Sequence, residues 1–398
     1  MTVSAASTAR RINRGIVIRV SLRYGGASLP IILPVNTPLI SAVSDTRHAE
    51  ALAVTCGGSV LVDEFGPQIH ITSAGADVQS VLNGWVAPVA DLAVLSVEGD
   101  DAVRFLHSQL TNDIETLNEE RWVLAGYCSA KGRLLTSLMC WRTQAGVRLI
   151  IPQPFVPGLK KRLSMFVLRA KVRIIDETEH WCLFGLGGRG AADMVKALGG
   201  HWPAPKAVDQ SGPLVLLGCV PIPAADLSSS EDAASVARAL LLVPTPDGAT
   251  VWSTLTSGLT GWSSTLWRWA DTRAGQPRLA AAGLERFVPQ MVNLDLVDGV
   301  SFKKGCYPGQ EVVARSHYLG KLKRRMFLAH VAGPAPAAGS DVLAPSATEP
   351  CGEVVMSAPS PQGGSHLLFE SQITLAPQAC LADGRLLTLL GLPYPVER

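Results

Sequence analysis

The 398-residue sequence lacks the cysteine and histidine spacings of a metal site. Its 8 cysteines are widely scattered, none forms a C-x-x-C pair, and no histidine stands at metal-ligand spacing from any of them. Zinc and cluster cages need such spacings, so we predict no resident metal. Scattered cysteines with apolar neighbours are typical of buried thiols in a reducing compartment.

Long apolar runs and a large charge of one sign are also missing. No run approaches the ~18 to 20 apolar residues of a membrane span, so we expect no membrane partner. Only 17% of the residues are charged and the net charge is +2, which gives no reason to expect direct binding of nucleic acid. We expect a cytoplasmic protein. Residues 1–26 hold five arginines and no acid, so a transit peptide and the mitochondrial matrix stay as the alternative.

Apolar residues make up 47% of the chain, which is enough for two or three domain cores. The residues 92–99 read as a strand and lead into an apolar-periodic helix. Two apolar runs, 122–128 and 134–141, flank a polar, glycine-containing connection that is typical of a hairpin. A helix over 159–167 and a strand over 172–175 complete a β-α-β-β-α-β order, the split unit of ferredoxin-like α+β domains.

A second α+β unit is predicted to begin at Trp181, with a strand over 182–186 and a further helix over 231–241. After Arg325, short strand-like runs alternate with loops rich in proline, glycine and serine, which indicates a small β-barrel. The predicted fold class is α+β. The predicted divisions are an N-terminal extension of unknown role at 1–85, a main region at 86–326 with subdomains at about 86–180 and 181–326, and the barrel at 327–398.

The segment Gly185–Gly190 matches the G-x-G-x-x-G pattern between a predicted strand and a predicted helix. A dinucleotide site also needs an acidic residue at the end of the next strand, about 20 residues on. That stretch, 201–205, contains histidine, tryptophan and prolines and no strand pattern. A plain glycine turn is therefore favoured over nucleotide binding.

Cys306 lies in a turn-rich segment with a glycine on each side and a proline close by. Three lysine or arginine charges, including Lys304 and Arg315, lie within ten residues of its sulfur. Nearby cations favour thiolate over thiol, and a helix opening at Gln310 and Glu311 would add its N-terminal dipole. These features predict a reactive thiol at Cys306, with a structural turn cysteine as the alternative.

The same segment carries a family resemblance. The residues 304–315 read K-G-C-Y-x-G-Q-E-x-x-x-R, which resembles the signature of the YgfZ family, relatives of the glycine-cleavage T-protein. The resemblance extends to 105–113, to 128–133 and to 287–294, and covers roughly residues 90 to 398.

The resemblance implies three domains around a central channel that holds tetrahydrofolate or a related folate, with the cysteine loop nearby. It also implies a role in the assembly or repair of iron-sulfur clusters, hence in cluster-dependent tRNA modification, with iron-sulfur client or assembly proteins as partners. The implied working residues are Cys306 with Lys304 and Arg315, the loop residues Gly305, Tyr307, Gly309, Gln310 and Glu311, and the folate contacts Trp267, Gln290, Asn293 and Asp113. Relatives can carry a second ligand-contacting tryptophan where this chain has Leu92.

Two other functions stay open. A tetrahydrofolate-dependent aminomethyltransferase or demethylase of the T-protein type needs a carboxylate, but hydroxyl groups stand at the corresponding Thr136 and Ser137. Asp113 lies near by in sequence but also suits a structural Asx turn. A pure interaction scaffold predicts that Cys306→Ser has no effect. Whether the chain is an enzyme is thus left undecided by the sequence.

Overall fold

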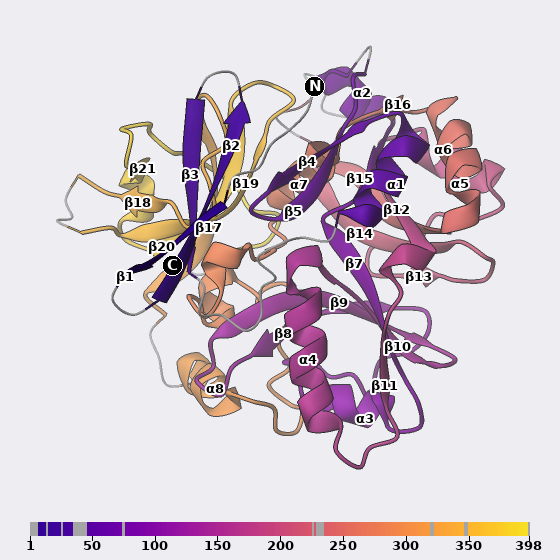
Figure 1. Cartoon of the computed structure of the whole chain (residues 1–398), viewed down its shortest axis with the longest axis horizontal. Coiled ribbons are helices and arrows are strands. Elements are labelled where there is room, and N and C mark those ends of the chain that lie inside the picture. Colours follow the sequence, from indigo (N-terminus) through magenta and orange to yellow (C-terminus); the bar gives the residue numbers. More distant parts are fainter. Residues whose placement is uncertain are drawn as a thin grey trace.

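The computed structural model of the chain describes most of its length and is drawn in Figure 1. The described residues are 7–12, 15–24 and 27–34, as backbone, together with 46–73, 76–224, 227, 235–318, 322–345 and 349–396. The first three ranges pair as an antiparallel sheet of β1 (Ser7–Ile12), β2 (Gly15–Tyr24) and β3 (Ala27–Pro34). Within the described ranges, no helix combines the length and apolar character needed to cross a bilayer.

The first large sheet has five strands in the order β11-β7-β10-β9-β8, all paired antiparallel. Its strands are β7 (Leu92–Glu98), β8 (Trp122–Cys128), β9 (Leu134–Thr143), β10 (Gly146–Pro152) and β11 (Arg173–Asp176). Its helices are α3 (Ala102–His107) and α4 (Val156–Val167). The predicted strands and helices are present, but β10 was missed. It pairs with β7 and β9, so the unit is a five-stranded sheet rather than the predicted four-stranded split unit.

The second large sheet has the order β13-β14-β15-β12-β6-β16. Its strands are β6 (Trp85–Pro88), β12 (Trp181–Gly187), β13 (Val208–Asp209), β14 (Val215–Pro223), β15 (Ser235–Pro244) and β16 (Thr260–Gly261). The accompanying helices are α5 (Ala191–Ala197) and α6 (Gly248–Thr256).

The helix predicted over 231–241 is wrong where the structure describes that stretch. Residues 235–244 form strand β15, which lies between β14 and β12, and residues 231–234 lie outside the described residues. The side chains of 239–243 are fully buried. A strand covered on both faces is continuously apolar, so hydrophobic periodicity does not separate it from a buried helix.

Residues 46–88 pack against this second sheet. The segment contains α1 (Arg47–Cys56), β4 (Ser59–Asp63), β5 (Gly66–His70), α2 (Val78–Asn83) and β6. Leu52 and Ala53 of α1 share a core with Phe184 of β12 and Trp252 of α6. The division predicted at residue 86 therefore falls inside a strand of this sheet.

The C-terminal region is a six-stranded antiparallel sheet in the order β21-β18-β19-β20-β17-β22. Its strands are β17 (Arg324–Val331), β18 (Asp341–Leu343), β19 (Gly352–Pro359), β20 (Ser365–Gln372), β21 (Cys380–Leu381) and β22 (Thr388–Leu390). The all-β character expected after Arg325 is thus present, and the division predicted after residue 326 falls within β17.

Helix α7 (Ser264–Arg273) joins these regions and contacts β5, β6, β14, β19 and β20. Residues 266–273 of the helix are all buried. Its aromatic and charged side chains make contacts with both neighbouring regions. Trp269 donates a hydrogen bond from Nε1 to Nδ1 of His366 on β20, 2.7 Å away. Arg268 pairs with Asp63 and Asp91. Figure 1 shows α7 at the centre of the molecule, between the two lobes that contain β17–β21 and β12–β15.

Candidate functional site

The loop that presents Cys306 is anchored by Lys304. Lys304 is only 8% exposed, and its Nζ donates hydrogen bonds to the carbonyl oxygens of His107 and of Leu110, the latter 2.7 Å away. These carbonyls lie at the end of α3, where a helix leaves its last C=O groups without intrahelical partners. Lys304 therefore ties the Cys306 loop to the segment 105–113.

Burial lowers the pKa of Lys304 to about 8, because the charged ammonium loses hydrating water and the surrounding protein groups compensate for this only in part. The carboxylates of Asp113 and Glu115 act in the opposite direction. The Nζ also lies 5.1 Å from the ring centroid of Tyr307, which is buried. At neutral pH the ammonium is thus still charged, and the carbonyls and the ring hold it in place.

Asp113 lies beside this loop. Its Oδ1 is 3.2 Å from Nδ1 of His107, and it accepts hydrogen bonds from the backbone N–H groups of Glu115 and Thr116, which is an Asx turn. Gly305 lies over the same imidazole, where an added Cβ would be 3.8 Å from Nε2. His107 was not predicted as a site residue; it lies six residues before Asp113, and only the fold shows that the two side chains meet.

The hairpin between β8 and β9 supports the other end of the loop. Gly309 has a φ of +79°, and a Cβ there would lie 2.5 Å from backbone atoms of Gly132 and Ser129. Gly132, with a φ of +69°, would in turn collide with Val312. Both positions need glycine because two backbones meet there. Three sequence segments with the family resemblance, 105–113, 128–133 and 302–311, are therefore neighbours in space.

Cys306 itself is exposed at the tip of this arrangement. Six of the other cysteines are buried and Cys380 is half-buried. Helix α8 (Gln310–Tyr318) begins four residues later, as the sequence predicted, and Gln310 Nε2 lies 3.5 Å from the carbonyl oxygen of Lys304. Glu311 and Arg315 are exposed on α8.

Gln290 and Asn293 lie beneath the loop and are fully buried. Gln290 Nε2 donates to the carbonyl oxygen of Val313 in α8, 2.7 Å away. The Asn293 side chain makes two hydrogen bonds with the backbone of Met326 in β17. Its Nδ2 donates to the carbonyl oxygen and its Oδ1 accepts from the N–H. Both amides thus connect backbone segments.

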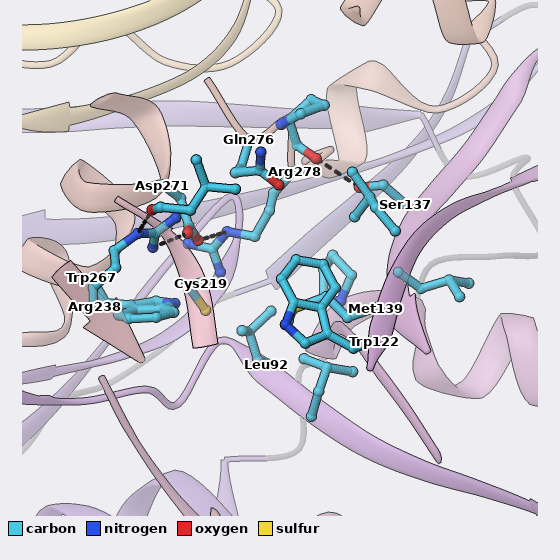
Figure 2. Close-up of a pocket in the computed structure, with 16 residues that line it drawn as sticks. Leu92, Trp122, Ser137, Met139, Cys219, Arg238, Trp267, Asp271, Gln276 and Arg278 are labelled. Carbon is cyan, nitrogen blue, oxygen red and sulfur yellow. Dashed lines mark hydrogen bonds and ion pairs between the residues drawn. The ribbon is translucent and has the colours of Figure 1, made fainter. Parts of the chain in front are cut away.

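A separate pocket lies between the two large sheets and is drawn in Figure 2. Its walls come from β7–β10 on one side and from β14, β15, α7 and the segment after α7 on the other. Its lining residues are Leu92, Trp122, Leu124, Ser137, Leu138, Met139, Ile150, Pro152, Cys219, Val220, Arg238, Trp267, Asp271, Gln276, Pro277 and Arg278. Of the four predicted folate contacts, Trp267 lines this pocket, whereas Gln290, Asn293 and Asp113 do not.

The Trp267 indole packs closely on two neighbours. The strand β12 approaches so closely that a Cβ on Gly185 would be 2.1 Å from the ring. The guanidinium carbon of Arg238 lies over the ring, 4.9 Å from its centroid. Gly187 makes the same room for Trp85. Two glycines of the G-x-G-x-x-G pattern therefore accommodate indoles within strand β12, and the predicted glycine turn is confined to residues 188–190.

Charged side chains at the pocket form an alternating buried chain, of which Figure 2 draws Arg238, Asp271 and Arg278. Arg238 Nη1 lies 2.6 Å from Asp271 Oδ1, Arg278 Nε lies 3.1 Å from Asp271 Oδ2, and Arg278 Nη1 lies 3.2 Å from Asp91 Oδ2. Burial opposes ionisation of Asp91, but the coulombic attraction of Arg278 and Arg268 outweighs it and holds the pKa of Asp91 below its usual value. The sequence analysis missed Arg238, although a single arginine in an apolar run is an unusual pattern that signals a buried partner.

Two buried donors in this pocket have no hydrogen-bond partner among the described residues. They are Trp267 Nε1 and Arg278 Nη2. An unsatisfied buried donor costs roughly 1 to 3 kcal/mol, so a ligand that brings hydrogen-bond acceptors would be stabilised here. The described part of the chain contains no group of three or more histidine, cysteine or acidic side chains placed to hold a metal ion.

Comparison with known proteins places this arrangement in a family. No protein-family model matches the chain. The "tRNA-modifying protein YgfZ" of Yersinia pestis (strain Pestoides F) is 31% identical over 281 residues, which cover 70% of this chain and 79% of that protein. The protein of the same name from Pectobacterium carotovorum is 30% identical over 63% of this chain and 72% of that protein. The chain belongs to the YgfZ family.

The fold of this YgfZ-family chain resembles that of a solved structure. The crystal structure of the glycine cleavage system aminomethyltransferase T from Bartonella henselae superimposes with a TM-score of 0.61, covering 87% of this chain and 96% of that one, at 14% identity. Mixed α and β content on a T-protein-like fold is therefore established, in agreement with the predicted α+β class.

A basic run, Lys321, Lys323, Arg324 and Arg325, follows α8. Arg324 pairs with Glu370, and Arg325 Nη1 lies 2.7 Å from Asp295 Oδ1. Lys321 lies outside the described residues. Two charges of the basic run are therefore neutralised by acids of this chain.

Proposed function

We propose that this YgfZ-family chain binds a tetrahydrofolate-type ligand in the pocket between its two large sheets and assists the assembly or repair of iron-sulfur clusters. Cys306 is the working thiol, and the clusters serve enzymes that modify tRNA. The partners are then iron-sulfur client or assembly proteins. The observation that carries the proposal is the convergence of three distant motif segments on one exposed cysteine.

The loop geometry supports a thiol that acts on another protein or its metal. Lys304 fixes the backbone before Cys306 and the start of α8 fixes the backbone after it, so the sulfur is held outward. Cysteine sulfur is a soft ligand of the kind that iron-sulfur clusters use. One thiolate cannot enclose an iron-sulfur cluster, so the remaining ligands come from the client, and the cluster is a transient substrate.

The pocket chemistry supports a folate. Its apolar and aromatic lining suits a flat ring, and the unpartnered donor of Arg278 suits the ring's acceptor atoms. A bound tetrahydrofolate supplies a reduced pteridine that can carry a one-carbon unit. The pocket's carboxylate, Asp271, has both oxygens paired with guanidinium groups, so no observation favours aminomethyl transfer over an accessory role.

Titration with tetrahydrofolate, followed by tryptophan fluorescence, tests the folate assignment. Wild type should show saturable quenching, Trp267→Ala should bind more weakly, and Cys306→Ser should bind as wild type does because Cys306 is not among the pocket residues. Absence of saturable binding to the wild-type protein would remove the folate assignment.

A further inference from the structure

Arg238 lies over the Trp267 indole, where a stacked ring of a ligand would otherwise be placed. Its guanidinium carbon is 4.9 Å from the ring centroid, and the indole also packs closely on Gly185. We propose that Arg238, rather than Trp267, presents the ring-binding surface of this pocket, and that it takes the pteridine end of the ligand. The inference rests on the proposed folate binding and says which group makes the contact.

The guanidinium of Arg238 is fixed on three sides. Its Nη1 pairs with Asp271, its Nε donates to the carbonyl oxygen of Val220 over 2.7 Å, and its face lies on the indole. The residue is only 2% exposed. A planar cation held in this way offers its second face to a flat heteroaromatic ring, because guanidinium groups stack on π systems. Trp267 is then a positioning residue that acts through Arg238.

The rest of the pocket completes a slot for a flat ring. Trp122 and Met139 lie on the opposite side of the pocket from Arg238 in Figure 2, next to Leu92. The Trp122 indole is oriented by a hydrogen bond from its Nε1 to the carbonyl oxygen of Gly218, 2.8 Å away. An aromatic wall is therefore present although position 92 carries leucine.

The polar groups at the edge of the slot determine which end of the ligand binds there. Arg278 is 8% exposed and its Nη2 has no partner among the described residues, while its other two nitrogens face Asp271 and Asp91. The free group is a donor, so it requires an acceptor such as the ring carbonyl of a pteridine. An aminobenzoyl-glutamate end offers its strongest acceptors as anionic carboxylates, and burying those in this enclosed slot costs more than burying a neutral ring carbonyl.

A competing interpretation makes the opposite prediction. In that interpretation the Arg238 side chain fills the ligand's position and must move before the ligand can stack on Trp267. Removing Arg238 would then tighten binding, because the ligand would no longer have to break the Arg238–Asp271 salt bridge. If Arg238 is the contact surface, removing it weakens binding.

Calorimetric titration with tetrahydrofolate separates these outcomes. We expect Arg238→Met to weaken binding about tenfold or more. Arg238→Lys should weaken it similarly, because lysine lacks the planar guanidinium group. Trp267→Phe should retain most of the affinity. Arg173→Met, which removes an exposed arginine on β11, is the matched control and should bind as wild type. Unchanged or tighter binding by Arg238→Met, with wild type binding normally, overturns the inference alone; no binding by wild type overturns the proposed folate binding as well.

Competition with fragments tests the ligand's orientation on the wild-type protein, so it holds even if an Arg238 variant fails to fold. A reduced pterin without a tail, 6-methyltetrahydropterin, should displace tetrahydrofolate from the pocket. The fragment p-aminobenzoyl-glutamate should not do so at the same concentration. The reverse order of competition would contradict the assignment of the pteridine end to Arg238.

Discussion

The Cys306 loop and the pocket between the sheets are built in opposite ways. The loop is held at the surface by hydrogen bonds from the Lys304 ammonium to backbone carbonyl oxygens and by the close approach of Gly309 to Gly132, and it leaves its thiol exposed. The pocket is held in the interior by ion pairs among residues far apart in sequence, such as Arg238 and Asp271. Loss of the exposed thiol should therefore affect function with little effect on stability, whereas loss of a charged pocket residue should affect both.

Asp271→Ala is the change expected to have the largest effect on stability. It leaves the guanidinium groups of Arg238 and Arg278 buried without their shared carboxylate, which costs about 3 to 5 kcal/mol when one partner of a buried pair is removed. Chemical denaturation of wild type and variant measures the loss. Asp193→Ala, an exposed aspartate on α5, should change stability by less than about 0.5 kcal/mol. A loss below about 1 kcal/mol for Asp271→Ala would show that the pocket charges are not the pocket's main support.

Gly309→Ala should have the largest effect within the loop. The new Cβ would lie 2.5 Å from the backbone of Gly132, at a φ of +79°, so we expect a loss of about 2 to 3 kcal/mol. Gly305→Ala is the control in the same loop, because a Cβ there meets only the imidazole of His107, at 3.8 Å. Thermal unfolding of both variants checks the difference. Equal stability of the two would contradict the packing of the loop against the β8–β9 hairpin.

The buried ammonium of Lys304 should make stability depend on alkaline pH. Its folded pKa of about 8 is below its unfolded value, so between these values the unfolded chain binds more protons and stability rises with pH. Comparing wild type with Lys304→Met isolates this contribution. We expect wild type to gain about 1 kcal/mol relative to the variant between pH 7 and pH 9, measured by denaturation in urea. A constant difference between the two proteins over that range would argue against a buried, charged lysine.

Cys306→Ser should have the smallest effect on stability, less than about 0.5 kcal/mol, because the thiol is exposed. Cys140→Ser is the contrasting variant. It puts a hydroxyl into a fully buried site on β9, where burial already raises the pKa of the thiol, and should cost about 1 to 3 kcal/mol. Similar losses in the two variants would mean that Cys306 is not presented to solvent.

The contrast between loop and pocket also explains what the sequence could predict. The start of α8 at Gln310, the exposure of Cys306 and the Asx turn at Asp113 follow from residues that are neighbours in sequence. Local chemistry is sufficient there, because turn residues and helix termini act over a few positions.

The pocket could not be predicted in this way. Arg238 and Asp271 are 33 positions apart, and their pairing depends on how α7 packs against β15. The strand β15 was predicted as helix for a related reason, since burial on both faces removes the alternation that identifies a strand. The missed strand β10 is likewise defined by its hydrogen bonding to β7, some 50 residues earlier in the sequence.

Complementation of a bacterial strain that lacks its own YgfZ protein is the most direct test of the account, with the level of a cluster-dependent tRNA modification as the readout. The account predicts that wild type restores the modification, and that Cys306→Ser and Arg238→Met each fail while accumulating as folded protein. Full restoration by Cys306→Ser would contradict the role of the exposed thiol and leave the chain as an interaction scaffold.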